Sequence, residues 1–151
     1  MSKSKKTLPA FLNQFPWNEL LFRGEVSAKT RSWTWGHIGW TLLYTSKSRV
    51  VRPVMDAYGL EVDDTLGCLV GVGWLKSVRR NTTKERAQLE SQYSNGGGYI
   101  GIIAGLYRFE FAPLHRFTKP IPFVAPRGAA RIFTVPYPVV AKELELLGIS
   151  I

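Results

Sequence analysis

Cysteine and histidine, which often build disulfides, zinc sites and catalytic dyads, are almost absent from this sequence. Its 151 residues include one cysteine, Cys68, and two histidines, His37 and His115. A single cysteine excludes an internal disulfide and a cysteine-based zinc cluster. The histidines have neither suitably spaced carboxylates nor an obvious Ser or Cys partner. We therefore expect no metal, no cofactor and no catalytic residues, and we expect Cys68 to be a buried thiol.

Long hydrophobic runs are also missing. No stretch approaches the roughly 20 apolar residues that span a bilayer, and the longest candidate, residues 99–107, is broken by glycines. The basic start of the chain is not followed by the apolar segment of a signal peptide. We therefore expect a cytoplasmic protein without membrane contact. Residues 1–12 are expected to form a basic, flexible tail, and residues 13–151 a single domain.

Acidic residues are scarce, with 11 Asp and Glu against 20 Lys and Arg, which gives a net charge of +9. The excess is concentrated near the N-terminus, where residues 1–52 carry nine basic residues and only Glu19 and Glu25 as acids. A basic surface of this kind is compatible with a nucleic-acid partner, although charge alone does not identify one.

Turn residues and apolar spacing predict short elements without a regular alternation of strands and helices. Six prolines between residues 113 and 138 favour extended chain there. Ser46 is a candidate N-cap for one helix, and glycines follow several of the expected helices. The pattern predicts a mixed, barrel-like α+β domain. Helices are expected over residues 16–23, 47–58, 84–90 and 139–147, and strands over 29–35, 40–44, 66–78, 99–111, 121–124 and 131–135.

A first candidate site is a segment in which cations alternate with indoles. In a strand, Lys29, Arg31, Trp33 and Trp35 would share one face. The cations would neutralise phosphates, and the indoles would stack on unpaired bases. The alternative is that the tryptophans pack in the core while the cations snorkel or form ion pairs.

A second candidate site lies at an expected junction between a strand and a helix. Ser46, Lys47 and Arg49 offer hydroxyls, amides and two cations to an anion. Ordinary helix capping explains the serines equally well. Arg127 lies in a third basic segment, the turn over residues 126–131.

Several motifs, in this order, resemble those of the ASCH domain, a branch of the PUA-like superfamily that also contains PUA, EVE and YTH domains. They are PWNELLFRG at 16–24, KTRSW at 29–33, GWTLLYTSK at 39–47, GCLVGV at 67–72 and PIP at 120–122, followed by Arg127-Gly128. The resemblance implies a PUA-like mixed β-barrel flanked by short helices. It also implies that Arg31, Trp33, Ser46 and Lys47 line the family's pocket.

The hallmark of that family is G-x-K-x-x-E-x-R, and this sequence keeps only part of it. With the glycine placed at Gly24, the lysine position holds Val26, the glutamate position holds Lys29, and the arginine is Arg31. The lysine and the residue at the glutamate position are implicated in catalysis in members that deacylate modified cytidine. Valine cannot transfer a proton, so the resemblance does not carry that activity over.

The function predicted from the sequence is nucleic-acid binding. We expect RNA, or another single-stranded or modified nucleic acid, to lie in a basic groove lined by aromatic side chains. Two alternatives stay open: a small amidohydrolase acting on a modified nucleoside, and a protein-interaction module with an acidic partner.

Overall fold

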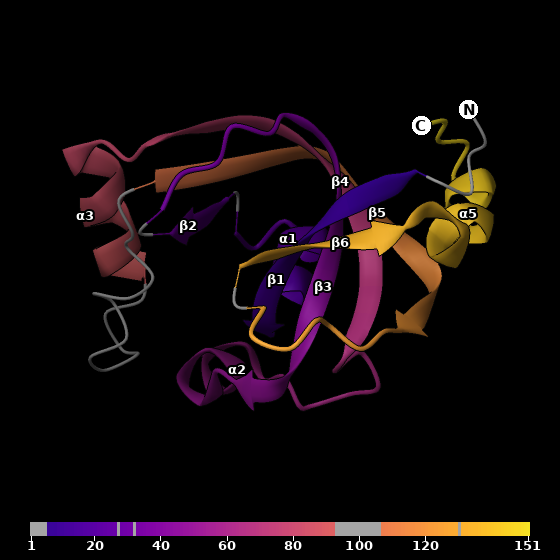
Figure 1. Ribbon diagram of the computed structural model, residues 1–151. Coiled ribbons are helices and arrows are strands. Elements are labelled where there is room, and N and C mark those ends of the chain that lie inside the picture. The colour runs from indigo at the N-terminus through magenta and orange to yellow at the C-terminus, as the bar shows by residue number, and fades with distance from the viewer. Residues whose placement is uncertain (1–5, 27, 32, 93–106, 130) are drawn as a thin grey trace.

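Six strands form one sheet at the centre of the computed structural model, which describes residues 6–26, 28–31, 33–92, 107–129 and 131–151 (Figure 1). In chain order they are β1 (Thr7–Phe15), β2 (Lys29–Arg31), β3 (Gly39–Val50), β4 (Cys68–Arg80), β5 (Tyr107–Pro122) and β6 (Ile132–Pro136). Their order across the sheet is β2-β5-β4-β3-β1-β6. Strands β1 and β3 are parallel, and the other neighbours are antiparallel.

The predicted α+β class is confirmed, but closure of the sheet into a barrel is not. Within the described chain, β2 and β6 each pair with one neighbour only, so the sheet stays open between these two edges. Figure 1 shows two helices at opposite sides of the sheet, α3 (Thr83–Gln92) and α5 (Tyr137–Leu146). The other helices are α1 (Trp17–Arg23) and, at the lower end of the sheet, α2 (Arg52–Tyr58). None of the helices in the described ranges is long and apolar enough to cross a membrane.

Helix α1 follows the local signals of the sequence. Pro16 precedes its first turn, where a missing amide hydrogen has no effect on the helix. Gly24 ends it with φ of 75°, a left-handed conformation that favours glycine. The helix buries Trp17, Leu20 and Leu21. The prediction of this helix from the sequence is therefore confirmed.

The helix expected over residues 47–58 is wrong in its first half. Strand β3 continues to Val50, and α2 begins at Arg52, so Ser46 lies in a strand and caps no helix. Long-range pairing decides the boundary: Val50 pairs with Phe15 of β1, and the Val51 amide donates to the Phe15 carbonyl at 2.8 Å. Proline at position 53 then falls in the first turn of α2, where it is tolerated.

The tail expected over residues 1–12 is also corrected, because β1 begins at Thr7 and occupies an interior position in the sheet. Leu8, Ala10 and Phe11 of this strand are buried. Pro9 argues against a central strand from sequence alone. The pairing of β1 with β3 begins only at Ala10, so proline is tolerated one residue earlier, where β6 is the partner.

Both faces of the central strands are buried. Successive residues of β3, Leu42 and Leu43, belong to two separate hydrophobic clusters on the two faces. Cys68 is buried in the second cluster, as predicted. Burial raises the pKa of its thiol. Of the strand expected over residues 99–111, β5 supplies the part from Tyr107 onward, and residues 99–106 lie outside the described residues.

Candidate nucleic-acid interface

A groove of about 560 Å³ lies between the end of β3 and the chain that follows β5. We name it the Lys47 groove. Its volume falls in the usual range of ligand sites, about 300–1,000 Å³. It brings together residues that are far apart in the sequence. Its walls are formed by Leu12, Tyr44, Ser46, Lys47, Ser48, Leu66, Gly67, Pro122, Phe123, Val124, Ala125, Pro126 and Ala129.

Hydrogen bonds and one ring stack fix the two walls of the groove. The Tyr44 hydroxyl donates to the Phe123 carbonyl at 2.8 Å, and burial raises the pKa of this tyrosine. The Phe123 amide donates to the Gly67 carbonyl at 3.0 Å, and the Gly67 amide donates to the Thr45 carbonyl at 2.8 Å. The Phe123 ring is stacked on Phe133 with 5.8 Å between centroids and an interplanar angle of 6°. The aromatic wall is therefore held in place before any ligand binds.

Lys47 lies across Gly67, which has a left-handed backbone with φ of 73°. A methyl group added to this glycine would lie 3.4 Å from Lys47 Cβ and 3.5 Å from Lys47 Cδ. The lysine stem therefore packs on bare backbone, and the residue is exposed to solvent. Ser46 accepts a hydrogen bond from the Ser48 amide at 3.3 Å.

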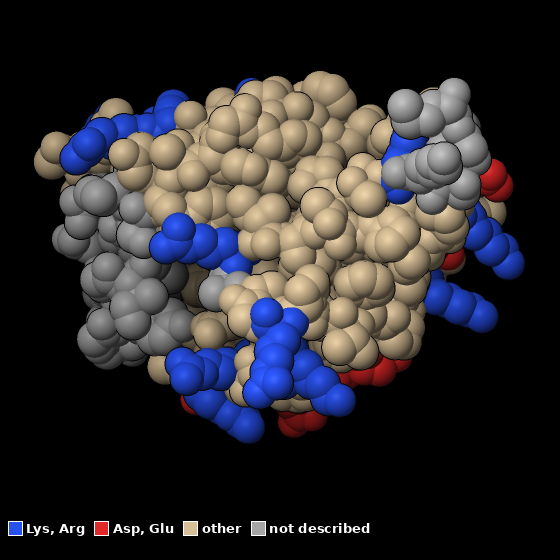
Figure 2. Space-filling model, in the orientation of Figure 1, with Lys and Arg blue, Asp and Glu red and all other residues tan. Residues whose placement is uncertain are grey.

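The rim of the groove is basic. Lys47, Arg49 and Arg52 are exposed near the end of β3 and the start of α2, and Arg127 is exposed between the lining residues 126 and 129. Within the described part of the chain, none of these four cations forms an ion pair. Figure 2 shows Lys and Arg side chains gathered at the lower end of the molecule, where α2 lies. Their charge is thus available to an anionic ligand.

Arg31 organises a buried polar chain beside the groove. Its guanidinium donates to the Asn13 side-chain oxygen and, at 3.3 Å, to the carbonyl of Leu12, a lining residue. Asn13 then donates to Asn18 at 2.6 Å, and Asn18 donates to Thr45 at 3.1 Å. Because the two asparagines and Thr45 are nearly fully buried, the chain satisfies polar groups that water cannot reach. The position of Arg31 is fixed by these bonds.

Trp33 packs against the core cluster of Phe11 and Phe109. Its ring centroid lies 5.0 Å from that of Phe109 and 5.9 Å from that of Phe11. The guanidinium of Arg131 lies over the Trp33 ring, 5.3 Å from its centroid. The Arg131 carbonyl accepts the Leu12 amide at 3.0 Å, which places this pair next to the groove. Arg31 and Trp33 of the first candidate site therefore adjoin, through Leu12, the groove that holds Ser46 and Lys47 of the second.

Lys29 and Trp35 lie elsewhere. Lys29 is 4% exposed, and its Nζ lies 3.6 Å from the centroid of the Trp17 ring. Burial and the neighbouring Arg31 charge hold the pKa of Lys29 well below its usual range. Trp35 packs against the core cluster of Phe109 and is not among the groove residues. Neither side chain is positioned to line the Lys47 groove.

The structure thus brings Ser46 and Lys47 into the groove, with Arg49 and Arg127 near its rim and Arg31 and Trp33 at one end. Phe123, the aromatic ring of the groove wall, was missed from the sequence. It lies between prolines at 122 and 126, and an aromatic residue in such an extended segment was the available signal. Its role depends on the pairing of β5 with β4, which no local pattern encodes.

Other chemistry is not assembled in the described ranges. No group of three or more His, Cys, Asp or Glu side chains there could hold a metal ion. Val26, at the position of the family's lysine, packs against the cluster of Trp17 and Leu20. What the site offers is a preformed aromatic groove with cations at its edge.

No protein-family model and no curated protein sequence matches this chain. Its fold is similar to the crystal structure of an ASCH protein from Zymomonas mobilis, with a TM-score of 0.56 over 96% of each chain at 10% identity. Two mutant forms of that protein give TM-scores of 0.55 and 0.53 at 10% and 11% identity. They cover 91% and 97% of this chain and 96% and 99% of their own. The chain therefore has the fold of an ASCH domain, as its motifs predict.

Proposed function

We propose that this protein binds single-stranded RNA, or a modified nucleotide within such a strand, in the Lys47 groove. The observation that carries the proposal is the combination of a preformed aromatic wall with exposed cations that form no ion pair in the described chain. A fold by itself does not define a function, so the argument rests on this site. A cytoplasmic location stays a prediction.

The groove offers the two kinds of contact that a single strand requires. Bases have flat faces that stack on aromatic rings, and Phe123 presents a ring already fixed by its stack on Phe133. Phosphates need cations, which Lys47, Arg49 and Arg127 supply near the rim. Hydroxyl groups at Ser46 and Ser48 can bond base edges or ribose. Arg31 would support the groove by holding Leu12, and Trp33 by packing beside it.

The proposal is tested by binding of a fluorescein-labelled oligouridylate of about 16 nucleotides, the upper site size of common single-strand-binding folds. We expect fluorescence anisotropy to show affinity that falls steeply with salt, because phosphate contacts release counterions. Phe123→Ala should weaken binding by about 1–3 kcal/mol and leave the salt dependence unchanged. Val124→Ala is the control, since Val124 lines the same groove but has no ring to stack on a base. Absent or salt-independent binding by the wild type would contradict the proposal.

One observation favours a second candidate, the amidohydrolase. A buried lysine with a lowered pKa is the usual form of an amine that acts as a base or nucleophile, and Lys29 has both properties. Against this, Lys29 lies on the Trp17 ring outside the groove, and Val26 cannot transfer a proton.

We therefore expect no deacylation of an acylated cytidine above a heat-killed control. Liquid chromatography of the products measures this directly. Turnover that is lost in Lys29→Met, while the melting temperature is kept, would reverse the ranking of the two functions.

A further inference from the structure

A second set of aromatic side chains lies across three strands, away from the Lys47 groove. The Trp35 and His37 rings are 4.7 Å apart, the Trp40 and Trp74 rings 5.2 Å apart, and the Trp40 and His115 rings 6.1 Å apart, all between centroids. Trp40 belongs to β3, Trp74 to β4 and His115 to β5. We call these five residues the aromatic row. Both histidines of the chain belong to it.

Gly39 joins the two halves of the row. A methyl group placed on it would lie 3.5 Å from His37 Cε1 and 3.9 Å from Trp74 Cη2, so both rings border the same residue. Its φ of 135° is one that other residues rarely adopt. The His37 ring is held in place by contacts of its Nε2 with the Trp40 carbonyl at 3.3 Å and the Thr41 hydroxyl at 3.2 Å. The row therefore turns around Gly39 at the start of β3: Trp35 packs against the cluster of Phe109, and Trp40 packs against the cluster of Leu42 on the other face of the sheet.

Part of the row faces solvent. Trp74 is 38% exposed and the neighbouring Ile38 is 51% exposed, which makes them two of the large hydrophobic side chains that the fold leaves uncovered. The Trp40 and Trp74 rings stand nearly perpendicular, at 86°. In an edge-to-face pair one ring presents its edge to the other, so this contact covers at most one face of either indole.

The charge around the row indicates what that flat group is. All five residues lie in stretches without a single Asp or Glu, residues 26–55, 65–84 and 111–142. The nearest acids along β5 and α1 are already paired, Glu110 with Arg79 and Arg108, and Glu19 with Arg116. An exposed aromatic surface without carboxylates suits the bases of a nucleic acid.

We propose that the aromatic row is a second contact surface for single-stranded nucleic acid, at which a base stacks on Trp74. The class of ligand rests on the proposed function, but none of the five residues of the row lines the Lys47 groove. Trp40 and Lys47 are seven positions apart on β3, about 23 Å at 3.3 Å per residue. One nucleotide cannot reach both sites, so the row extends the bound length of a strand.

The test uses the full chain and the labelled oligouridylate of about 16 nucleotides. We expect Trp74→Ala to weaken binding roughly 5-fold to 150-fold with an unchanged salt slope, because stacking releases no counterion. Trp74→Phe should retain most of the affinity. Val139→Ala, which removes an apolar side chain of similar exposure (37%) from α5, should bind as the wild type does. Because Trp74 is partly exposed, the variants are expected to fold, and thermal unfolding verifies this.

Each contrary outcome has its own meaning. If Trp74→Ala binds normally while Lys47→Ala lowers the salt slope, the row is not a nucleic-acid contact and the proposed function stands. If Trp74→Ala weakens binding but Lys47→Ala has no effect, the row stands and the groove falls. If Trp74→Ala changes only the oligomeric state, the row is a contact between copies of this chain, and the proposal is overturned. If the wild type does not bind the oligonucleotide, both proposals fail.

Discussion

The indole of Trp33 lies half-buried between an aromatic core and a cation. Its contacts with Phe11 and Phe109 make it a packing residue, with Arg131 over its ring. Truncation of a fully buried tryptophan to alanine costs about 3–5 kcal/mol of stability. Because Trp33 is only half-buried, we expect Trp33→Ala to lower the free energy of unfolding by about 2 kcal/mol. Urea denaturation measures this, and Trp33→Phe should lose less. A variant of unchanged stability that binds RNA weakly would instead return Trp33 to base stacking.

Single residues show how far residue type predicts a role. Lys47 was predicted from its charge and its neighbouring hydroxyls, and it lines the groove. Lys29 carries the same charge and alternates correctly with Arg31, yet it is buried on the Trp17 ring. The difference lies in the partner strand: Lys29 pairs with Phe109 of β5, a contact across 80 positions. Local alternation gives the face of a strand, but only its pairing tells which face is buried.

At the scale of the element, the turn before β4 depends on Gly67. Alanine at its φ of 73° is strained by about 1–2 kcal/mol, and relief of that strain would disturb the two hydrogen bonds that join Gly67 to Thr45 and Phe123. We expect Gly67→Ala to lower both the melting temperature and the affinity for RNA. Gly59→Ala is a matched control, with a similar φ of 64°, open space around it and no contact with the groove. Equal losses of affinity in the two variants would contradict the prediction.

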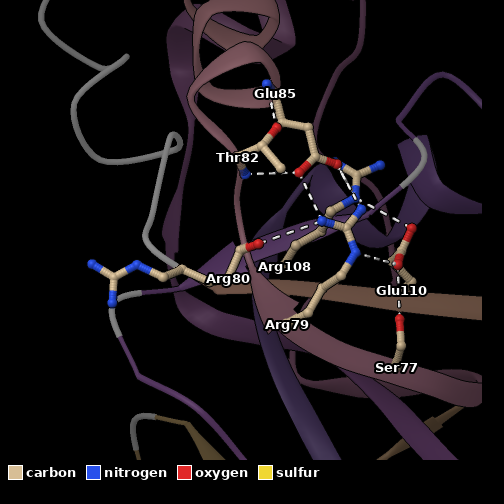
Figure 3. Close-up of polar contacts among 7 residues, drawn as sticks. All are labelled: Ser77, Arg79, Arg80, Thr82, Glu85, Arg108 and Glu110. Atoms are coloured by element: carbon tan, nitrogen blue, oxygen red, sulfur yellow. Dashed lines mark hydrogen bonds and ion pairs between the residues drawn. The ribbon is translucent and has the colours of Figure 1, made fainter.

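Helix α3 is held by an ionic cluster that Figure 3 shows in full. Glu85 accepts the Thr82 amide at 2.9 Å and contacts Arg79 at 2.6 Å and Arg108 at 3.4 Å. Glu110 joins the cluster through Arg79 at 3.3 Å, and Ser77 donates to it at 2.7 Å. The start of the helix is thereby fixed to β4 and β5.

This cluster predicts a sensitivity to acid. The hydrogen bond from Arg79 lowers the pKa of Glu85 to about 2, whereas in the unfolded chain it titrates near 4.3. The unfolded chain therefore binds more protons between these values. The contribution of Glu85 is complete above about pH 4.3 and is lost as the pH falls through 2. The Thr82 amide donates to the Glu85 carboxylate, so its protection factor against hydrogen exchange should fall on acidification, and Glu85→Gln should lower that protection factor already at pH 7. Identical protection in both proteins would show that the cap contributes nothing.

The elements differ in how well the sequence predicts them. Helix α1 and the start of α3 follow local signals, namely Gly24 after one helix and the reciprocal Thr82 and Glu85 bonds of a capping box at the other. Strand β1 and the second half of β3 do not, because each exists through the pairing of Phe15 with Val50 and of Ala10 with Leu42. From sequence alone, the residues of β1 are predicted as a tail and the end of β3 as the start of a helix. Only the parallel pairing of β1 with β3 shows that both are strands.

At the scale of the whole molecule, the distribution of charge matters more than the net charge of +9. Glu19 and Glu110 are held in ion pairs with arginines, whereas Asp63 and Asp64, just before the groove residues Leu66 and Gly67, form none within the described ranges. The cations at the rim of the Lys47 groove form no such pairs within the described ranges. A diffuse basic charge would attract any polyanion weakly, whereas fixed cations beside an aromatic wall would define a binding site.

Two variants that remove the same amount of charge separate these cases. The first replaces Lys47, Arg49 and Arg127 with alanine, and the second replaces Arg80, Lys84 and Lys142, exposed cations away from the groove. For a single strand, each lost phosphate contact lowers the salt slope by about 0.7, so we expect the first variant to lose about 2. The second should keep the wild-type slope, because its cations touch no phosphate. Fluorescence anisotropy of the labelled oligouridylate over a series of salt concentrations gives both slopes. Equal decreases in the two variants would mean that net charge alone attracts the RNA, and the Lys47 groove would lose its assigned role.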